Sequence, residues 1–143
     1  MVKNKKAYFE YSISEEYVAG IQLVGSEVKS IKDNKVSIGE AYCYISDGQA
    51  YIKGMNVSEY KQSGKYANHE PARERRLLLN KKEILKIESQ LTQKGLALVP
   101  LAIYTTKTGL IKVKIGLGKG KKLHDKRNTI KERDQERELQ RKF

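Results

Sequence analysis

Polar and apolar positions alternate over several short segments of this chain, which is the pattern of half-buried β-strands. Residues 7–24, "AYFEYSISEEYVAGIQLV", are rich in Tyr, Ile and Val and predict two strands, or one long strand that bends at Gly20. Residues 36–46 and 49–55 are two further β-type runs on either side of Asp47-Gly48. An Asp-Gly pair between such runs is a strong hairpin signal, so we expect these two segments to pair.

A second hairpin is predicted for residues 97–106 and 110–117, which meet around Thr108-Gly109. Its second strand, "LIKVKIGL", places lysines between apolar residues, as expected for a strand with one buried face and one basic face. Residues 58–76 are polar and charged, and they predict a long loop between the two hairpins.

Helical spacing appears in two places. Ser26 is a good N-cap for a short helix over 27–33. Asn80 and Glu83 fit a capping box that begins a longer helix over 81–94. About six short strands with one short and one longer helix predict a mainly β fold, and a small antiparallel barrel of the OB type is the simplest arrangement. The preference for the OB type over other small barrels rests on analogy between folds.

The last 25 residues have a different composition, so we expect two parts, a barrel over 1–118 and a basic tail over 119–143. The tail holds ten Lys or Arg and five Asp or Glu, and a helix starting near Ile130 has no apolar face. Such a segment gains little by docking on its own body. We therefore expect the tail to be disordered when free and to become helical against a polyanion.

The net charge of +12 narrows the choice of partners. It divides into +7 over 1–118, from 19 basic and 12 acidic residues, and +5 over 119–143, from 10 basic and 5 acidic residues. Because both parts are basic, an anionic partner such as nucleic acid is expected.

Other classes of protein are disfavoured. The longest apolar stretch, "LALVPLAI" at 96–103, is too short to span a membrane, and the N-terminus lacks the apolar core of a signal peptide. The single cysteine, Cys43, fits a reducing cytosol and is expected to be a buried small hydrophobe. No zinc spacing and no catalytic constellation are present, and the histidine in the loop, His69, is expected to pack there. We expect a cytoplasmic monomer, not an enzyme, with no cofactor, metal, membrane or small-molecule substrate.

Five segments, in order, carry a resemblance to a known family: "GSEVKS" at 25–30, "NHEP" at 68–71, "RLLLNKKEI" at 76–84, "KGLALVPLAIY" at 94–104 and "GLGKGKKLHDKRNTIKER" at 116–133. Together they resemble the SsrA-binding proteins (small protein B) of bacterial trans-translation. The resemblance implies an OB barrel that binds the tRNA-like domain of transfer-messenger RNA and delivers it to stalled ribosomes. It also implies a tail that meets small-subunit ribosomal RNA in the decoding centre and probes the empty message channel.

Two sets of candidate binding residues follow from the lysine pattern and the resemblance. Those expected to bind RNA are Asn4, Lys5, Lys6, Glu27, Lys29, Lys32, Lys35, Leu78, Lys119, Lys121 and Lys122. Those expected to bind the ribosome are His124, Asp125, Lys126, Arg127, Lys131, Arg133, Arg137 and Arg141.

Each candidate also has a structural interpretation. Glu27 could accept hydrogen bonds from bases or a 2′-hydroxyl, as the resemblance implies, or it could stabilise the first turn of its helix. The segment Asn4–Lys6 could be a solvated terminus, and Leu78 could be buried beside the other leucines of 77–79. The lysines could be solvated surface, and the glycines of 116–120 a flexible hinge that also exposes backbone amides to phosphate.

The leading functional hypothesis is a non-enzymatic RNA-binding adaptor. The alternative is a structural ribosomal protein of the OB class, which would stay on ribosomes at salt concentrations that remove an adaptor. A nuclease or RNA-modifying enzyme is disfavoured by the missing catalytic set, and incubation with labelled RNA, with and without divalent metal, would test it.

Overall fold

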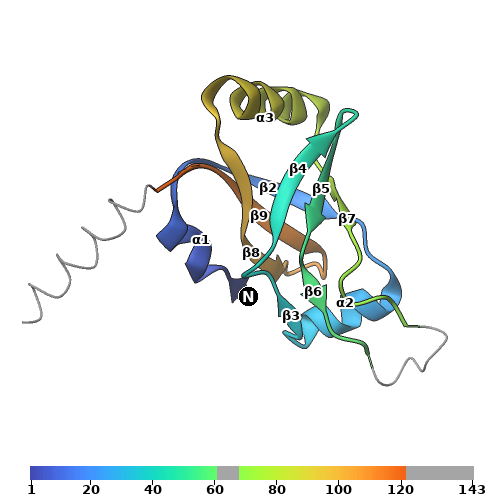
Figure 1. Ribbon diagram of the computed structural model, residues 1–143. Helices are drawn as coiled ribbons and strands as arrows, with labels where there is room; N and C mark the ends of the chain where they lie inside the picture. Colours follow the sequence, from blue (N-terminus) through green and yellow to red (C-terminus); the bar gives the residue numbers. More distant parts are fainter. Residues whose placement is uncertain (61–67, 122–143) are drawn as a thin grey trace, which may run out of the picture.

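The computed structural model of this chain describes residues 1–60 and 68–121. Nine strands and three helices occur in these residues (Figure 1). In chain order they are β1 (Val2–Lys3), α1 (Lys5–Glu10), β2 (Tyr11–Ile21), α2 (Gly25–Lys32), β3 (Val36–Ser37), β4 (Tyr42–Ser46), β5 (Gln49–Lys53), β6 (Asn56–Val57), β7 (Arg75–Leu78), α3 (Lys81–Lys94), β8 (Ala97–Thr105) and β9 (Ile111–Gly120).

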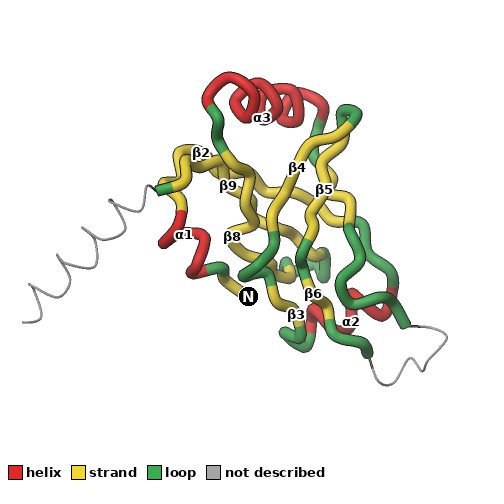
Figure 2. The backbone as a smooth tube through the Cα atoms, in the orientation of Figure 1, coloured by secondary structure: helices red, strands yellow, loops and turns green. Residues whose placement is uncertain are grey.

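Six of the strands form a closed antiparallel barrel. They follow one another in the order β8, β4, β5, β7, β2 and β9, and a pairing between β8 and β9 closes the ring. Helix α3 lies across the end of the barrel where the β4–β5 hairpin turns, and α2 lies near the opposite end with β3 and β6 (Figure 2). The predicted mainly β class and the six-stranded OB-type barrel are confirmed.

Strand alternation supplies the core. Side chains that point into the barrel are fully buried, among them Ile52, Leu77, Leu98, Val113 and Ile115. A large aliphatic side chain taken fully out of water contributes about 1.5–3 kcal/mol. A register slip of one residue would turn this whole set outward, so the apolar face fixes the pairing.

Both predicted hairpins are confirmed. In the first, Ser46 pairs with Gln49, and the residues between them, Asp47 and Gly48, have φ of 50° and 73°, as a tight turn matched to the strand twist requires. In the second, Thr105 of β8 pairs with Ile111 of β9.

The longer helix is also confirmed, with its caps. The Asn80 Oδ1 atom accepts a 2.8 Å hydrogen bond from the Glu83 amide, and Gly95 ends the helix with φ of 62°. Ile84 and Ile87 bury one face of this helix.

The N-terminal part of the chain differs from the prediction. Residues 7–10 were expected in a strand because of their aromatic content, but they belong to helix α1. The Asn4 side chain caps this helix, since its Oδ1 accepts a 3.1 Å hydrogen bond from the Ala7 amide. Its Nδ2 donates to the carbonyl oxygens of Ile38 (3.1 Å) and Pro100 (2.9 Å), and these tertiary bonds override local β-propensity.

Two further predictions were wrong in detail. The short helix begins at Gly25, and Ser26 is not its N-cap but lies buried within the first turn. The predicted loop 58–76 ends early, because Arg75 already belongs to β7.

The glycines near the end of the barrel do not form a hinge. Gly116, Gly118 and Gly120 lie in β9, so the predicted boundary after residue 118 falls inside a strand. A Cβ atom at Gly118 would lie 2.9 Å from Ile13 Cδ1 and 3.0 Å from the Ser12 carbonyl oxygen. The missing side chain at Gly118 thus allows β2 and β9 to approach closely.

In the part of the chain that the structure describes, no helix is long and apolar enough to cross a membrane. The same residues contain no group of three or more His, Cys, Asp or Glu side chains that could hold a metal ion.

Candidate nucleic-acid interface

The predicted binding residues at the N-terminus are the N-cap and the first two residues of helix α1, and they differ in accessibility. Asn4 is only 3% exposed, and its donors and acceptor are used inside the protein, so the solvated-terminus interpretation is wrong for this residue. Lys5 and Lys6 are exposed, and Lys6 Nζ lies 2.7 Å from Glu40 Oε1. Of these three residues, only the two lysines are accessible from solvent.

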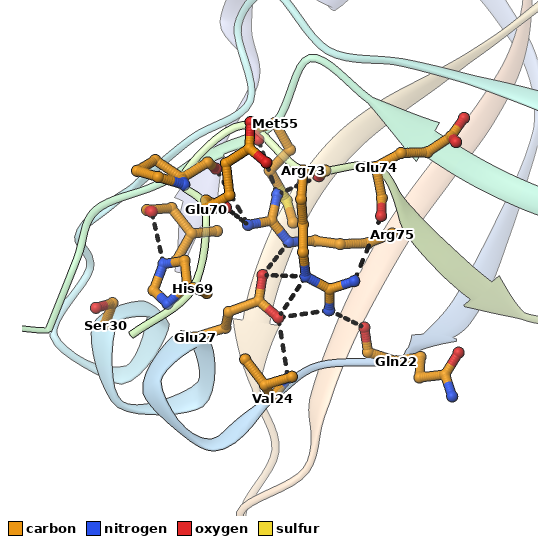
Figure 3. Close-up of polar contacts among 12 residues, drawn as sticks. Gln22, Val24, Glu27, Ser30, Met55, His69, Glu70, Arg73, Glu74 and Arg75 are labelled. Carbon is orange, nitrogen blue, oxygen red and sulfur yellow. Dashed lines mark hydrogen bonds and ion pairs between the residues drawn. The ribbon is translucent and has the colours of Figure 1, made fainter. Parts of the chain in front are cut away.

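Glu27 lies inside the protein in the first turn of α2, with no exposed surface. Its carboxylate faces two arginines, Arg73 just before β7 and Arg75 at the start of β7 (Figure 3). Arg73 Nη2 donates to Oε1 at 2.6 Å, and Arg73 Nε lies 3.1 Å from both carboxylate oxygens. Arg75 Nε donates to Oε2, and the Val24 amide donates to Oε1 at 2.9 Å. We call Glu27, Arg73 and Arg75 the buried ion cluster.

Arg75 connects this cluster to the surrounding loops. It is fully buried, and its remaining N–H groups donate to the carbonyl oxygens of Arg73 (2.8 Å), Met55 (2.9 Å) and Pro71 (3.1 Å). A guanidinium can satisfy several carbonyls at once because its donors are fixed in one plane. The cluster thus holds α2, the residues before β6 and the start of β7 together.

The pKa of Glu27 reflects opposing effects. Burial by itself raises the pKa of this carboxyl, but hydrogen bonds from Arg73, the Val24 amide and Arg75 hold it below its usual value. Burial lowers the pKa of Arg75, and the charge of Glu27 acts against that change. Glu27 is therefore an anion at neutral pH, and the two arginines neutralise it.

The position of Glu27 does not match the expectation of an acid on the RNA-binding surface. Its carboxylate is inside and already accepts hydrogen bonds from three groups, so it is not presented to bases or 2′-hydroxyls in this structure. The other interpretation, an acid that stabilises the first turn of its helix, describes its position better. The arginine partners, 46 and 48 residues away, gave no signal in the sequence.

His69 is buried next to this cluster, as predicted for a histidine that packs in the loop. Its Nε2 lies 2.8 Å from the Val57 carbonyl oxygen, and its Nδ1 lies 2.7 Å from Ser26 Oγ. The carbonyl can only accept, so Nε2 carries the proton and the Ser26 hydroxyl donates to Nδ1. Cys43, also predicted to be buried, is buried in the barrel core, and burial raises the pKa of its thiol.

The predicted lysines around α2 are at the surface. Lys29, Lys32 and Lys35 are exposed, and Lys29 Nζ lies 5.3 Å from the centre of the Tyr60 ring. This distance is within the range of a cation–π interaction. All three ammonium groups can therefore approach an anionic ligand.

Leu78 lies at the edge of an apolar groove beside α2. Its side chain is 49% exposed, whereas Leu77, its neighbour in β7, is buried. The groove has a volume of about 280 Å³, and Leu23, Val28, Leu78, Leu110 and Lys112 are among its lining residues. We call it the Leu78 groove. Lys112 and Leu110 were not among the predicted site residues, although the lysine–apolar alternation of β9 pointed to Lys112.

The end of β9 lies beside α1. Lys119 pairs with Ser12 in the β2–β9 ladder, and the Lys121 amide donates a 2.8 Å hydrogen bond to the Glu10 carbonyl oxygen. Lys119 is exposed and Lys121 is half-buried. Lys5, Lys6, Lys119 and Lys121 therefore belong to one region, separate from the Leu78 groove.

Other predicted residues lie outside the described residues, so the structure provides no positions for them. They are Lys122 and the whole set expected to bind the ribosome: His124, Asp125, Lys126, Arg127, Lys131, Arg133, Arg137 and Arg141.

Comparisons with known proteins cover the whole chain. A family model described as "SmpB protein" matches residues 1–143. A protein named SsrA-binding protein from Lactobacillus helveticus is 48% identical over 143 residues, which are 100% of this chain and 93% of that protein. Another of that name, from Gloeothece citriformis, is 50% identical over 138 residues, 96% of this chain and 88% of that protein.

A solved structure is also similar. One chain of the structure described as "tmRNA-SmpB: a journey to the center of the bacterial ribosome" is 40% identical and superposes with a TM-score of 0.72. The match covers 90% of this chain and 93% of that one.

Proposed function

Because the chain belongs to the SmpB family, we propose that it is a non-enzymatic adaptor that binds the tRNA-like domain of transfer-messenger RNA and carries it to stalled ribosomes. The observation that carries this proposal is the match to an SmpB chain from a tmRNA–SmpB structure of the ribosome, at 40% identity over 90% of this chain. The charge of +12 is of the sign that such partners require.

We assign the barrel the role of holding the tRNA-like domain. The exposed lysines of α2 and of the α1–β9 region can neutralise phosphates, which supplies affinity without sequence preference. The Leu78 groove can hold an apolar surface of a base or ribose, with Lys112 at its edge. The two kinds of contact together favour a folded RNA over an extended polyanion.

A pair of leucine variants tests the assignment of the groove. Leu78→Ala is expected to lower affinity for the tRNA-like domain about tenfold, because it removes an exposed apolar contact from the groove. Leu85→Ala is the matched control, since Leu85 is 58% exposed on helix α3 and lies outside the groove. Equal affinities of the two variants in a filter-binding or anisotropy titration would refute the role of Leu78.

RNA recovered from the cell tests the adaptor role itself. The protein, purified from its own cells at low salt, should carry transfer-messenger RNA, which sequencing of the bound RNA will identify. An adaptor should leave ribosomes at moderate salt, whereas a permanent ribosomal protein should remain. Retention at high salt without enrichment of transfer-messenger RNA would contradict the proposal.

We assign the tail, taken as the residues of 119–143 that follow strand β9, the role of testing whether the message channel is empty. The basic stripe of Lys126, Arg133, Arg137 and Arg141 can meet ribosomal RNA phosphates in the decoding centre and the channel beyond it, with the tail helical in that state. Ordering about 15 residues costs on the order of 15–25 kcal/mol of chain entropy, so many contacts are required.

Deletion of residues 124–143 tests the tail. The shortened protein should keep most of its affinity for the tRNA-like domain, because the described lysines of the barrel remain. Transfer of alanine from transfer-messenger RNA to a stalled peptide should be lost. The doublet Arg133→Glu/Arg137→Glu should reduce the same transfer with little change in RNA binding. Full transfer by the shortened protein would refute this role.

A further inference from the structure

Three tyrosines form a row on the outer face of the β4–β5 hairpin. Tyr44 and Tyr51 are directly opposite each other in the ladder, and their rings stack with centres 5.4 Å apart and planes inclined by 26°. Tyr42, two residues before Tyr44 and thus on the same face, has its ring centre 6.4 Å from that of Tyr44. Cys43 and Ile52, which alternate with them, point into the core, so the row faces outward.

Two cations flank this row. Lys53 pairs directly with Tyr42, and Arg76 of β7 pairs directly with Tyr51, so both lie on the outer face. Strands β4, β5 and β7 contain no acidic residue. We call Tyr42, Tyr44, Tyr51, Lys53 and Arg76 the tyrosine face.

The tyrosine face is accessible. Tyr42 is 48% exposed, Lys53 and Arg76 are exposed, and the other two tyrosines are half-buried. The lining residues of the Leu78 groove do not include any of the five members of the face, although Arg76 and Leu78 lie two residues apart on the outer side of β7.

We propose that the tyrosine face is a second RNA-binding site, which takes unpaired nucleotides by stacking their bases on the tyrosine rings. Proteins that bind single-stranded nucleic acid combine aromatic rings, on which bases stack, with cations that meet the phosphates, and the tyrosine face holds both. Bases within a duplex are stacked on one another and cannot reach the rings, so a duplex is not the expected ligand. The inference rests on the proposed function in one respect: the protein works among RNA molecules that expose unpaired segments.

A purely structural role for the row is the main alternative. Stacked cross-strand aromatic pairs stabilise sheets whether or not a ligand binds. This alternative accounts for the stacked pair of Tyr44 and Tyr51. It does not account for Tyr42, the end member of the row, which is about half exposed. It also does not account for cations opposite two of the three rings without an acidic partner in these strands.

A pair of variants separates the two roles. Tyr42→Leu/Tyr51→Leu removes two rings but keeps apolar side chains on the sheet. Tyr8→Leu is the matched control, because Tyr8 is 45% exposed but lies on helix α1, outside the tyrosine face. Affinities are measured by anisotropy for three labelled probes: an eight-nucleotide single-stranded RNA, a twelve-base-pair RNA duplex and the tRNA-like domain of transfer-messenger RNA.

The expected result is specific to the single strand. The double variant should bind that probe at least tenfold more weakly than wild type, because each stacked base depends on a ring, while Tyr8→Leu binds it normally. Both variants should bind the tRNA-like domain within about twofold of wild type. An unchanged affinity of the double variant for the single strand, or an equal loss in Tyr8→Leu, would overturn the inference.

A charge variant keeps the test independent of ring packing. Lys53→Gln changes only an exposed side chain, so folding is preserved. The slope of log affinity against log salt for the single strand should become shallower by about one phosphate contact. If this slope is the same in Lys53→Gln and wild type, Lys53 does not contact a phosphate, which would count against RNA binding at the tyrosine face. If wild type binds the tRNA-like domain but not the single strand, only this inference fails, whereas failure to bind the tRNA-like domain refutes the proposed function itself.

Discussion

Replacing Glu27 by Gln should cost about 3 kcal/mol of the free energy of unfolding at pH 7, because the substitution removes the anion from the buried ion cluster. Breaking a buried ion pair by neutralising one partner typically costs about 3–5 kcal/mol, since the other charge stays buried without compensation. Arg75 has no exposed surface, so water cannot replace the lost partner.

The geometry determines where in this range the value falls. In wild type the Val24 amide lies 2.9 Å from Glu27 Oε1. Gln keeps one oxygen, which can still accept this hydrogen bond. The other oxygen, which accepts from Arg75, becomes an NH₂ group that faces a donor. Arg75 retains its bonds to three carbonyls, and Arg73 is partly exposed and can be hydrated. These remaining contacts favour the lower end of the range.

Urea denaturation followed by tyrosine fluorescence measures the loss, because the chain has nine tyrosines and no tryptophan. The dependence on pH gives a second readout. The folded pKa of Glu27 lies below its unfolded value of about 4.3, so its contribution is complete above that pH and is lost as the pH falls through the folded pKa. The difference between wild type and Glu27→Gln should therefore be largest near neutral pH and shrink below about pH 4.

Glu40→Gln provides the control. Glu40 also accepts a short hydrogen bond from a cation, Lys6 at 2.7 Å, but both side chains are at the surface, so this variant should be nearly as stable as wild type. If Glu27→Gln were as stable as Glu40→Gln, or if the difference from wild type did not depend on pH, the account of the buried ion cluster would be wrong.

Three further predictions concern packing, the histidine and charge. Gly118→Ala should destabilise the barrel by about 1–3 kcal/mol, because its Cβ would lie 3.0 Å from the Ser12 carbonyl oxygen. Gly120→Ala is the control, since its Cβ meets nothing nearer than 3.9 Å and stability should change little. Equal melting temperatures of the two variants would argue against the close approach of β2 and β9 at Gly118. Ser26→Ala should cost about 1–3 kcal/mol in chemical denaturation, since His69 Nδ1 loses its donor, and a variant of wild-type stability would show that this bond is unimportant. Affinity of the protein for the tRNA-like domain should fall with salt at a log–log slope of about −3 to −5, as four to six neutralised phosphates require, and a flat response would contradict electrostatic binding.

Local chemistry predicted much of the fold. Asp47-Gly48 set one hairpin, and Asn80 with Glu83 set the start of α3, because turns and caps depend on residues adjacent in sequence. Helix α1 was missed because its cap, Asn4, is held by carbonyls of residues 38 and 100, which no local pattern reveals. The glycines of β9 appeared flexible in sequence, whereas Gly116 and Gly118 lie in a strand where neighbouring side chains and backbone leave no room for a Cβ atom.

The exposure of the candidate site residues was harder to predict than the fold. Lysines such as Lys29 and Lys32 were named from the lysine pattern and the resemblance, and they are exposed. Leu78 was named from the resemblance, and strand alternation in β7 explains why it is exposed while Leu77 is buried. The sequence could not show that Asn4 and Glu27 point inward, because polar side chains are usually at the surface. Burial of these two residues becomes understandable only with their partners in view.

The buried ion cluster also changes how loss of RNA binding in a Glu27 variant should be interpreted. The cluster connects α2, which carries Lys29 and Lys32, to the start of β7, which carries Leu78. A weakened cluster can therefore move the lysines relative to the Leu78 groove and lower affinity without any direct contact between Glu27 and RNA. If this is so, Arg75→Met, which removes the other buried charge, should weaken binding of the tRNA-like domain as Glu27→Gln does, although it leaves the carboxylate in place. If Glu27→Gln weakens binding while Arg75→Met does not, the carboxylate itself contacts RNA, which requires a conformation that opens the cluster.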